Sequence, residues 1–232
     1  MGLIVPAVLP SSRIDLEEKL ALFARIPLVS RVQIDVVDGH FASPASWPYS
    51  APGELQSRAK QSIMLPDLDR ITYEIDLMCH DAERAAGSWL TLGAARLTFH
   101  AESTTDLPRL LASARVRYGD FVAFGLAINI GSELRIIEPL LENIEYVQFM
   151  GIARIGRQGQ SFDRRVLEKI RVFRNHHPDI PVQVDGGVTL ESAKKLLALG
   201  VSNLVVGSSI LKAKDPATAF AQFEALESPF GV

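Results

Sequence analysis

The stretch Val182-Gln183-Val184-Asp185-Gly186-Gly187-Val188 is a short apolar run that ends in an aspartate and two glycines. Further along, Val205-Val206-Gly207-Ser208-Ser209 repeats the pattern of an apolar run followed by small residues. Glycine lets backbone N–H groups approach an anion closely, and the N-terminus of a following helix adds favourable potential. Two such turns after consecutive strands form the usual phosphate site of a (β/α)8 barrel. We therefore expect a phosphorylated small molecule to bind at Gly186, Gly187, Gly207 and Ser208.

Length and composition agree with a single barrel. The chain has 232 residues, of which 47% are hydrophobic, and one (β/α)8 barrel takes about 250. The net charge of −3 gives no basic footprint for nucleic acid or for an acidic membrane surface. No window is apolar enough to span a membrane, and the single cysteine fits a reducing compartment. We expect one cytoplasmic domain over residues 1–232, with no nucleic-acid or membrane partner.

Strand-like and helix-like segments alternate along the chain. Short runs rich in Val, Ile, Leu and Phe predict buried parallel strands at residues 3–9, 31–37, 71–78, 95–100, 121–128, 144–150, 181–185 and 203–206. Amphipathic stretches predict helices at 15–25, 81–90, 105–117, 132–141, 163–176, 189–199 and 215–226. Residues 38–62 are rich in Pro and Ser and leave room for a short helix only. Since no glycine-rich loop follows the first strand, a closed α/β barrel is favoured over an open doubly wound sheet.

Polar and charged residues interrupt these apolar strands near their ends. Strand alternation places Gln33 and Asp35 on one face of the second strand, and Glu74 and Asp76 on one face of the third. Asp185 ends the seventh strand. Charged side chains in buried strands are costly unless they are paired or used. The pattern therefore favours a functional role for these aspartates over a structural one.

The alternative is that each aspartate caps a helix or binds a loop amide. That role fits Asp38 better than Asp35 and Asp76, which lie inside the strand pattern. Removing a proton next to a ketone requires a positioned base and a group that stabilises the enediolate oxygens. Two carboxylates on opposite sides of a planar intermediate can exchange the roles of base and acid, and so invert a carbon in both directions.

The order of the motifs resembles the ribulose-phosphate 3-epimerase family. The matching motifs run from about residue 4 to residue 220 and are Ile-Asp-x-x-Asp-Gly-His-Phe, Asp-Leu-Met, Phe-His-x-Glu, Gly-Leu-Ala-Ile-Asn, Val-Asp-Gly-Gly-Val and Val-Val-Gly-Ser. The resemblance implies an isomerase that inverts C3 of a phosphorylated ketose, D-ribulose 5-phosphate to D-xylulose 5-phosphate, through a cis-enediolate. It implies Asp35 and Asp185 as the two catalytic groups, with Met78 and Met150 lining the substrate pocket.

The resemblance also implies a divalent metal held by two histidines and two aspartates. Here the two histidine positions hold Gln33 and Asp76. The expected ligand set is therefore rich in oxygen: Gln33, Asp35, Asp76 and Asp185. Such ligands suit Mg²⁺ or Mn²⁺ better than Zn²⁺. The alternative is that no metal binds, in which case at least one of the crowded aspartates should stay protonated near neutral pH.

Two more departures concern substrate contacts. The family usually has serines at the end of the first strand, where this chain has Ala7 and Pro10, followed by Ser11 and Ser12. In the loop 151–161 the family's phosphate-covering residues are matched by Gly156, Gly159 and Gln160. The loop also carries Arg154 and Arg157, and Arg157 is either a phosphate clamp or a solvated charge.

We expect a small phosphorylated sugar as the substrate and a homo-oligomer as the assembly. Two alternatives remain open at this stage. One is epimerisation of another phosphoketose, such as a hexulose 6-phosphate. The other is a non-catalytic phosphosugar-binding barrel, which the loss of both histidines and of the first-strand serine would explain. His100, after the fourth strand, is expected to support the site rather than to perform the chemistry.

Overall fold

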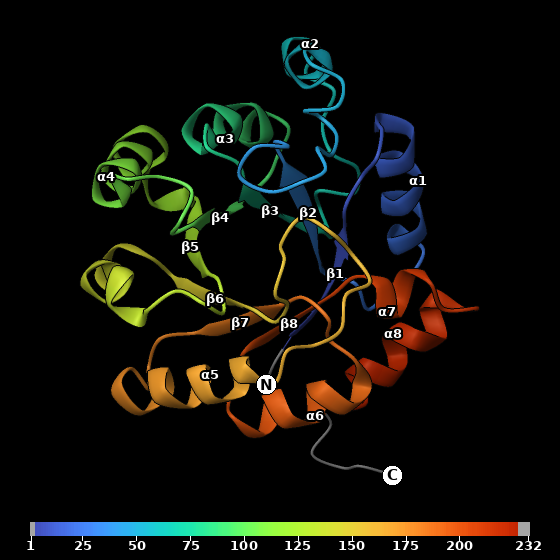
Figure 1. Ribbon diagram of the computed structural model, residues 1–232. Helices are drawn as coiled ribbons and strands as arrows, with labels where there is room; N and C mark the ends of the chain where they lie inside the picture. Colours follow the sequence, from blue (N-terminus) through green and yellow to red (C-terminus); the bar gives the residue numbers. More distant parts are fainter. Residues whose placement is uncertain (1–2, 227–232) are drawn as a thin grey trace.

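Eight parallel strands close into a barrel in the order of the sequence, β1 to β8. The computed structural model describes residues 3–226, and its helices surround the strands (Figure 1). The strands are β1 Leu3–Val8, β2 Arg31–Val37, β3 Thr72–Met78, β4 Arg96–His100, β5 Ala123–Ile128, β6 Tyr146–Met150, β7 Val182–Asp185 and β8 Asn203–Val206. The predicted (β/α)8 barrel is confirmed, with each strand within a residue or two of its expected ends. The ends of the predicted domain, residues 1 and 232, lie outside the described residues.

The helices are α1 Arg13–Ala24, α2 Glu54–Lys60, α3 Ala82–Thr91, α4 Leu107–Tyr118, α5 Arg165–His176, α6 Leu190–Ala198, α7 Ser208–Leu211 and α8 Pro216–Glu224. The short helix expected within residues 38–62 is α2. The helix predicted over 132–141 is wrong: this segment holds the 3₁₀ helices η2 (Leu134–Ile136) and η3 (Glu138–Asn143). The reason is Pro139, which lacks an N–H group and disfavours helical backbone at the residue before it.

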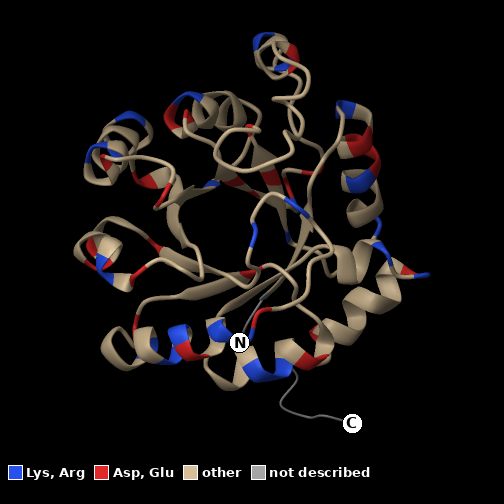
Figure 2. Cartoon of the chain, viewed as in Figure 1, with Lys and Arg blue, Asp and Glu red and all other residues tan. Residues whose placement is uncertain are grey.

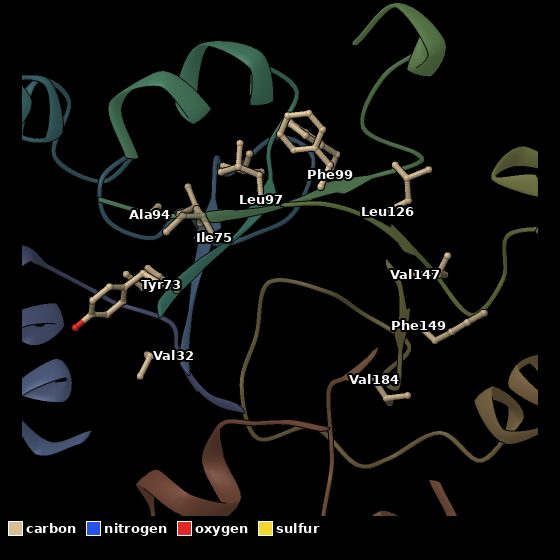
Figure 3. Close-up of a cluster of buried hydrophobic side chains, with 14 of the residues drawn as sticks. Val32, Tyr73, Ile75, Ala94, Leu97, Phe99, Leu126, Val147, Phe149 and Val184 are labelled. Carbon is tan, nitrogen blue, oxygen red and sulfur yellow. The ribbon is translucent and has the colours of Figure 1, made fainter. Parts of the chain in front are cut away.

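Side chains that alternate along the strands separate the core from the barrel interior. One set points outward toward the helices, including Tyr73 and Ile75 on β3 and Leu97 and Phe99 on β4 (Figure 3). These four side chains are completely buried. Burying each such side chain contributes about 1.5–3 kcal/mol. The residues between them on the same strands must therefore point into the barrel.

The register of the strands decides which inward residues meet. Asp35 pairs with Asp76 across β2 and β3, and Met150 pairs with Asp185 across β6 and β7. On the opposite side, β1 and β8 contribute a small apolar cluster of Val5, Ala7 and Val205. The interior is thus polar toward β2, β3, β6 and β7, and apolar toward β1 and β8.

Most charged residues lie on the outer helices and loops, while a few acidic positions lie on the strands within the ring of helices (Figure 2). Among residues 3–226, no helix combines the length and the apolar character needed to cross a membrane. The acidic positions inside the barrel are therefore the unusual feature of the charge distribution, and they mark the site described next.

Candidate active site

Three aspartates converge at the carboxyl-terminal end of the barrel. Asp35 comes from β2, Asp76 from β3 and Asp185 from the last position of β7. All three are buried, with exposed fractions of 6%, 0% and 8%. One oxygen from each carboxylate lies within 4.8 Å of the others. The structure thus brings together the three aspartates that the sequence pattern singled out.

Gln33 joins two of these carboxylates through its amide nitrogen. Its Nε2 donates to Asp35 Oδ1 at 2.8 Å and to Asp185 Oδ2 at 3.1 Å. Its oxygen instead accepts from the Gln183 amide at 3.3 Å. This orientation differs from the sequence-based expectation that Gln33 offers an oxygen ligand to a metal. The physical reason is the Gln183 side-chain amide, which donates to the Gln33 oxygen and so holds that oxygen away from the aspartates.

Asp76 is held by two side chains from neighbouring strands. His100 Nε2 on β4 lies 2.9 Å from Asp76 Oδ1, and both residues are completely buried. Gln148 Nε2 on β6 donates to Asp76 Oδ2 at 3.3 Å. Burial alone would lower the pKa of His100, but the Asp76 carboxylate and its hydrogen bond raise that pKa above its ordinary value. His100 therefore supports Asp76, in agreement with its expected supporting position.

Burial and mutual repulsion raise the pKa values of the other two aspartates. The pKa of Asp185 rises from 3.8 to about 7, mainly through burial and then through the charge of Asp76. Burial also raises the pKa of Asp35 well above its ordinary value, and the charges of Asp185 and Asp76 add to the effect. A carboxyl group that titrates near neutral pH can both accept and return a proton. The pair is therefore suited to general acid–base chemistry.

A glycine-rich pocket adjoins the aspartates. Its lining includes Asp35 and Asp185 together with every residue predicted to contact substrate: Met78, Met150, Gly156, Gly159, Gln160, Gly186, Gly187, Gly207 and Ser208. Gly187 has a φ of +66°, and a Cβ there would lie 2.6 Å from the backbone nitrogen of Phe162. Only glycine fits this close approach between the β7 turn and the preceding loop. The pocket thus combines two acidic groups with turns whose backbone is accessible to an anion.

The loop 151–161 covers this pocket. It follows β6 and crosses in front of the strands as the yellow segment of Figure 1. Gln158 Nε2 donates to the Ala7 carbonyl at 3.2 Å, and Arg157 Nε donates to the Ser43 carbonyl at 2.9 Å. The Gln160 amide donates within the loop, to the carbonyls of Arg154 and Arg157. With the loop in this position the cavity is about 40 Å³, which is room for a few water molecules.

The serines after β1 do not replace the serines usual in the family. Ala7 lines the pocket, but Ser11 and Ser12 are exposed and are used by α1. Ser12 caps that helix by accepting from the backbone N–H of Asp15 at 3.2 Å, and Ser11 donates to the Asp15 carboxylate. The structure supplies a different polar group here, the amide of Gln158.

Sequence reasoning missed three glutamines of this site. Gln158 lies in the covering loop, while Gln148 and Gln183 are completely buried inside the barrel. A signal for the buried pair was present, because each stands two residues before an identified site residue, Met150 and Asp185. Strand alternation places such residues on the same inward face.

Asp35, Asp76 and Asp185 have the chemistry of a site for a divalent cation. Their carboxylates are hard oxygen ligands, and their oxygens are close enough to bind one ion together. Each carboxylate held by Gln33 also keeps its second oxygen for another partner. A cation would relieve the repulsion among three buried negative groups. The donor set therefore fits a divalent metal without requiring Gln33 as a ligand.

Comparisons with known proteins show what the chain as a whole is similar to. The model of the ribulose-phosphate 3 epimerase family matches residues 3–211. A ribulose-phosphate 3-epimerase from Bacillus subtilis is 28% identical over 196 residues, covering 82% of this chain and 84% of that protein. A chloroplastic ribulose-5-phosphate-3-epimerase from Arabidopsis thaliana is 30% identical over 207 residues, covering 87% of this chain and 69% of that protein.

Solved structures support the fold. A 3-hexulose-6-phosphate synthase from Salmonella typhimurium superposes with a TM-score of 0.68 at 13% identity, covering 97% of each chain. At this identity the likeness supports the barrel fold alone. The family match spans most of the chain, residues 3–211 of 232. The chain therefore belongs to the ribulose-phosphate 3 epimerase family and is an isomerase-class enzyme.

Proposed function

We propose that this protein inverts C3 of D-ribulose 5-phosphate to give D-xylulose 5-phosphate, with Asp35 and Asp185 as the acid–base pair. One observation carries the proposal. Two buried carboxyl groups from β2 and β7 line the same pocket as the glycine turns after β7 and β8. A sugar phosphate anchored at those turns would reach the carboxyl groups with its carbon chain.

The reaction needs one proton removed and one returned. One aspartate takes the C3 proton, and the electron pair of the broken C–H bond forms the enediolate, whose negative charge develops on the former ketone oxygen. The other aspartate, protonated, gives its proton to the opposite face of C3. In the metal-free site the pKa values of both Asp35 and Asp185 are raised, which favours keeping a proton on one of the two groups. In the reverse direction the two groups exchange roles.

The hydrogen bonds of Gln33 and His100 keep the carboxylates in place during this exchange. Gln33 spans Asp35 and Asp185, and His100 holds Asp76 beside them. We infer that Asp35, Asp76 and Asp185 hold Mg²⁺ or Mn²⁺. When bound, such a cation supplies positive charge next to the reacting carbons.

Substrate entry requires movement of the loop 151–161. A cavity of about 40 Å³ is too small for a pentulose phosphate. The polar contacts that hold the loop down at its middle are single hydrogen bonds from Gln158 and Arg157 to carbonyl groups, and such bonds contribute only about 0.5–1.5 kcal/mol each. Ile155 adds apolar packing against Val37, Ala42 and Met78. Once the loop has closed again over the substrate, it excludes water from the enediolate.

The test is an epimerase assay on the purified protein after exhaustive chelation and after adding back Mg²⁺, Mn²⁺ or Zn²⁺. The proposal predicts conversion of D-ribulose 5-phosphate to D-xylulose 5-phosphate that is lost on chelation and restored best by Mg²⁺ or Mn²⁺. A hexulose 6-phosphate serves as the comparison substrate. Faster conversion of the hexulose phosphate would overturn the substrate assignment, and full activity after chelation would overturn the metal assignment.

A further inference from the structure

Gln183 lies directly below the aspartates, two residues before Asp185 on the inward face of β7. It is completely buried. Its amide nitrogen donates to Gln148 Oε1 at 2.8 Å and to Gln33 Oε1 at 3.3 Å, and it also contacts Glu74 Oε1. One amide nitrogen thus faces three oxygen acceptors from β6, β2 and β3.

Those contacts decide how the two neighbouring glutamines are oriented. A primary amide carries its acceptor oxygen and its donor nitrogen on opposite sides. Because the oxygens of Gln33 and Gln148 are turned to Gln183, their nitrogens are turned to the carboxylates. Gln33 donates to Asp35 and Asp185, and Gln148 donates to Asp76. A single side chain therefore orients an amide donor toward each of the three aspartates.

Gln183 is in turn oriented by Glu74. Arg96 Nε donates to Glu74 Oε2 at 2.8 Å, and Thr98 Oγ1 donates to Glu74 Oε1 at 3.3 Å. An ionised carboxylate only accepts hydrogen bonds, so the Gln183 amide must present its nitrogen to it. The reversed amide would place its oxygen against three other oxygens.

The opposite end of the same amide shows what this orientation costs. Gln183 Oε1 is buried and has no hydrogen-bond partner among the described residues. Leaving a buried acceptor unpaired is unfavourable. The amide keeps this orientation because the three acceptors on its nitrogen side outweigh the one unpaired oxygen.

We propose that Gln183 is a positioning residue for the epimerisation. It fixes the amides of Gln33 and Gln148 so that both present N–H groups to the aspartates. This inference rests on the proposed acid–base roles of Asp35 and Asp185. Gln183 itself does not line the pocket and acts only through its neighbours.

Three variants test the proposal. Gln183→Leu removes the donor at similar size, and Gln183→Glu replaces the donor with an acceptor. Val5→Ala is the matched control, because Val5 is also completely buried inside the barrel, within the apolar cluster on the β1 side. The measurements are kcat and KM for D-ribulose 5-phosphate, the melting temperature, and the side-chain amide ¹⁵N–¹H NMR signals of Gln33, assigned with Gln33→Leu.

A small misplacement of a reacting group costs about 10²-fold in rate. We therefore expect Gln183→Leu to lower kcat by about that factor with KM nearly unchanged, and Gln183→Glu to lower it further. Val5→Ala should lose thermal stability while keeping kcat. Wild-type kcat in Gln183→Leu would overturn the inference. So would a fall of kcat in Val5→Ala as large as that in Gln183→Leu, because a loss of stability would then explain both.

The NMR measurement separates this inference from the proposed function, since it needs no turnover. In the wild-type protein the Gln33 amide protons should be protected from solvent exchange, and in Gln183→Leu they should lose that protection. If the wild-type protein did not epimerise the sugar but the protection changed in this way, the orienting role would stand and the reaction assignment would fail. Unchanged protection in Gln183→Leu would overturn the orienting role.

Discussion

His100 Nε2 on β4 and Asp76 Oδ1 on β3 lie 2.9 Å apart in a part of the barrel that solvent does not reach. The resemblance to the family implies a metal-binding histidine at the position that Asp76 occupies. Asp76 thus places a carboxylate beside Asp35, and His100 supports that carboxylate from behind. A carboxylate therefore stands where an imidazole is expected, and the buried imidazole of His100 can balance its charge.

The first prediction concerns this pair. Replacing His100→Leu removes the hydrogen bond that fixes the Asp76 carboxylate. Loss of such a supporting partner typically weakens metal affinity by about 10- to 100-fold. We expect the dissociation constant for Mn²⁺, measured by titration calorimetry, to rise by that factor. His80→Leu, at an exposed histidine, should leave it unchanged. Equal or tighter binding by His100→Leu would show that His100 does not support the metal site.

The second prediction concerns the stability of the metal-free protein. An acid with a higher pKa in the folded than in the unfolded chain binds more protons when folded, so stability falls as the pH rises between the two values. For Asp185 that window runs from 3.8 to about 7, and Asp35 shifts in the same direction. The raised pKa of His100 also favours the folded state at lower pH.

The melting temperature in the presence of a chelator should therefore be higher at pH 5 than at pH 8. Added Mn²⁺ should raise it most at pH 8, where the aspartates are ionised. Asp185→Asn removes one of the titrating groups and should flatten the profile. A metal-free protein that becomes more stable as the pH rises across this range would contradict the assigned direction.

The third prediction concerns the phosphate end of the pocket. In Gly187→Ala the new Cβ meets the backbone of Phe162, and the positive φ is strained for alanine. Strain of this kind costs about 1–3 kcal/mol, and its relief must displace the turn or the covering loop. We expect KM for the phosphosugar to rise and the melting temperature to fall. Gly131→Ala is the control, because its Cβ would meet nothing within 4 Å. Equal effects of the two substitutions would argue against a built anion site.

The sequence contained most of the information about which residues meet. One face of every barrel strand points inward, so alternation alone predicts that Asp35, Asp76 and Asp185 lie together. The same alternation places Gln148 and Gln183 on the inward face. It does not predict which end of the Gln33 amide faces the aspartates, because a contact with Gln183, 150 positions away in the chain, decides that.

The covering loop gives a second example. Gly156, Gly159 and Gln160 match the family pattern, and all three line the pocket. The hydrogen bond from Gln158 to Ala7 was not predictable, because it depends on how the loop lies across β1. Arg157 is exposed, lines the pocket and donates a hydrogen bond to the Ser43 carbonyl. Its contact with the Ser43 carbonyl joins two segments that no sequence pattern links.

The central claim is that Asp35 and Asp185 act on opposite faces of C3, and proton exchange in deuterated water tests it most directly. Incorporation of deuterium at C3 is followed for D-ribulose 5-phosphate and, separately, for D-xylulose 5-phosphate. Asp35→Asn and Asp185→Asn should each slow interconversion by about 10²-fold or more, because positioned proton transfer contributes about 10²–10⁴-fold. Each variant should still exchange the C3 proton of one epimer, and the two variants should retain opposite epimers. Near wild-type interconversion by either variant, or retention of the same epimer by both, would contradict the two-aspartate mechanism.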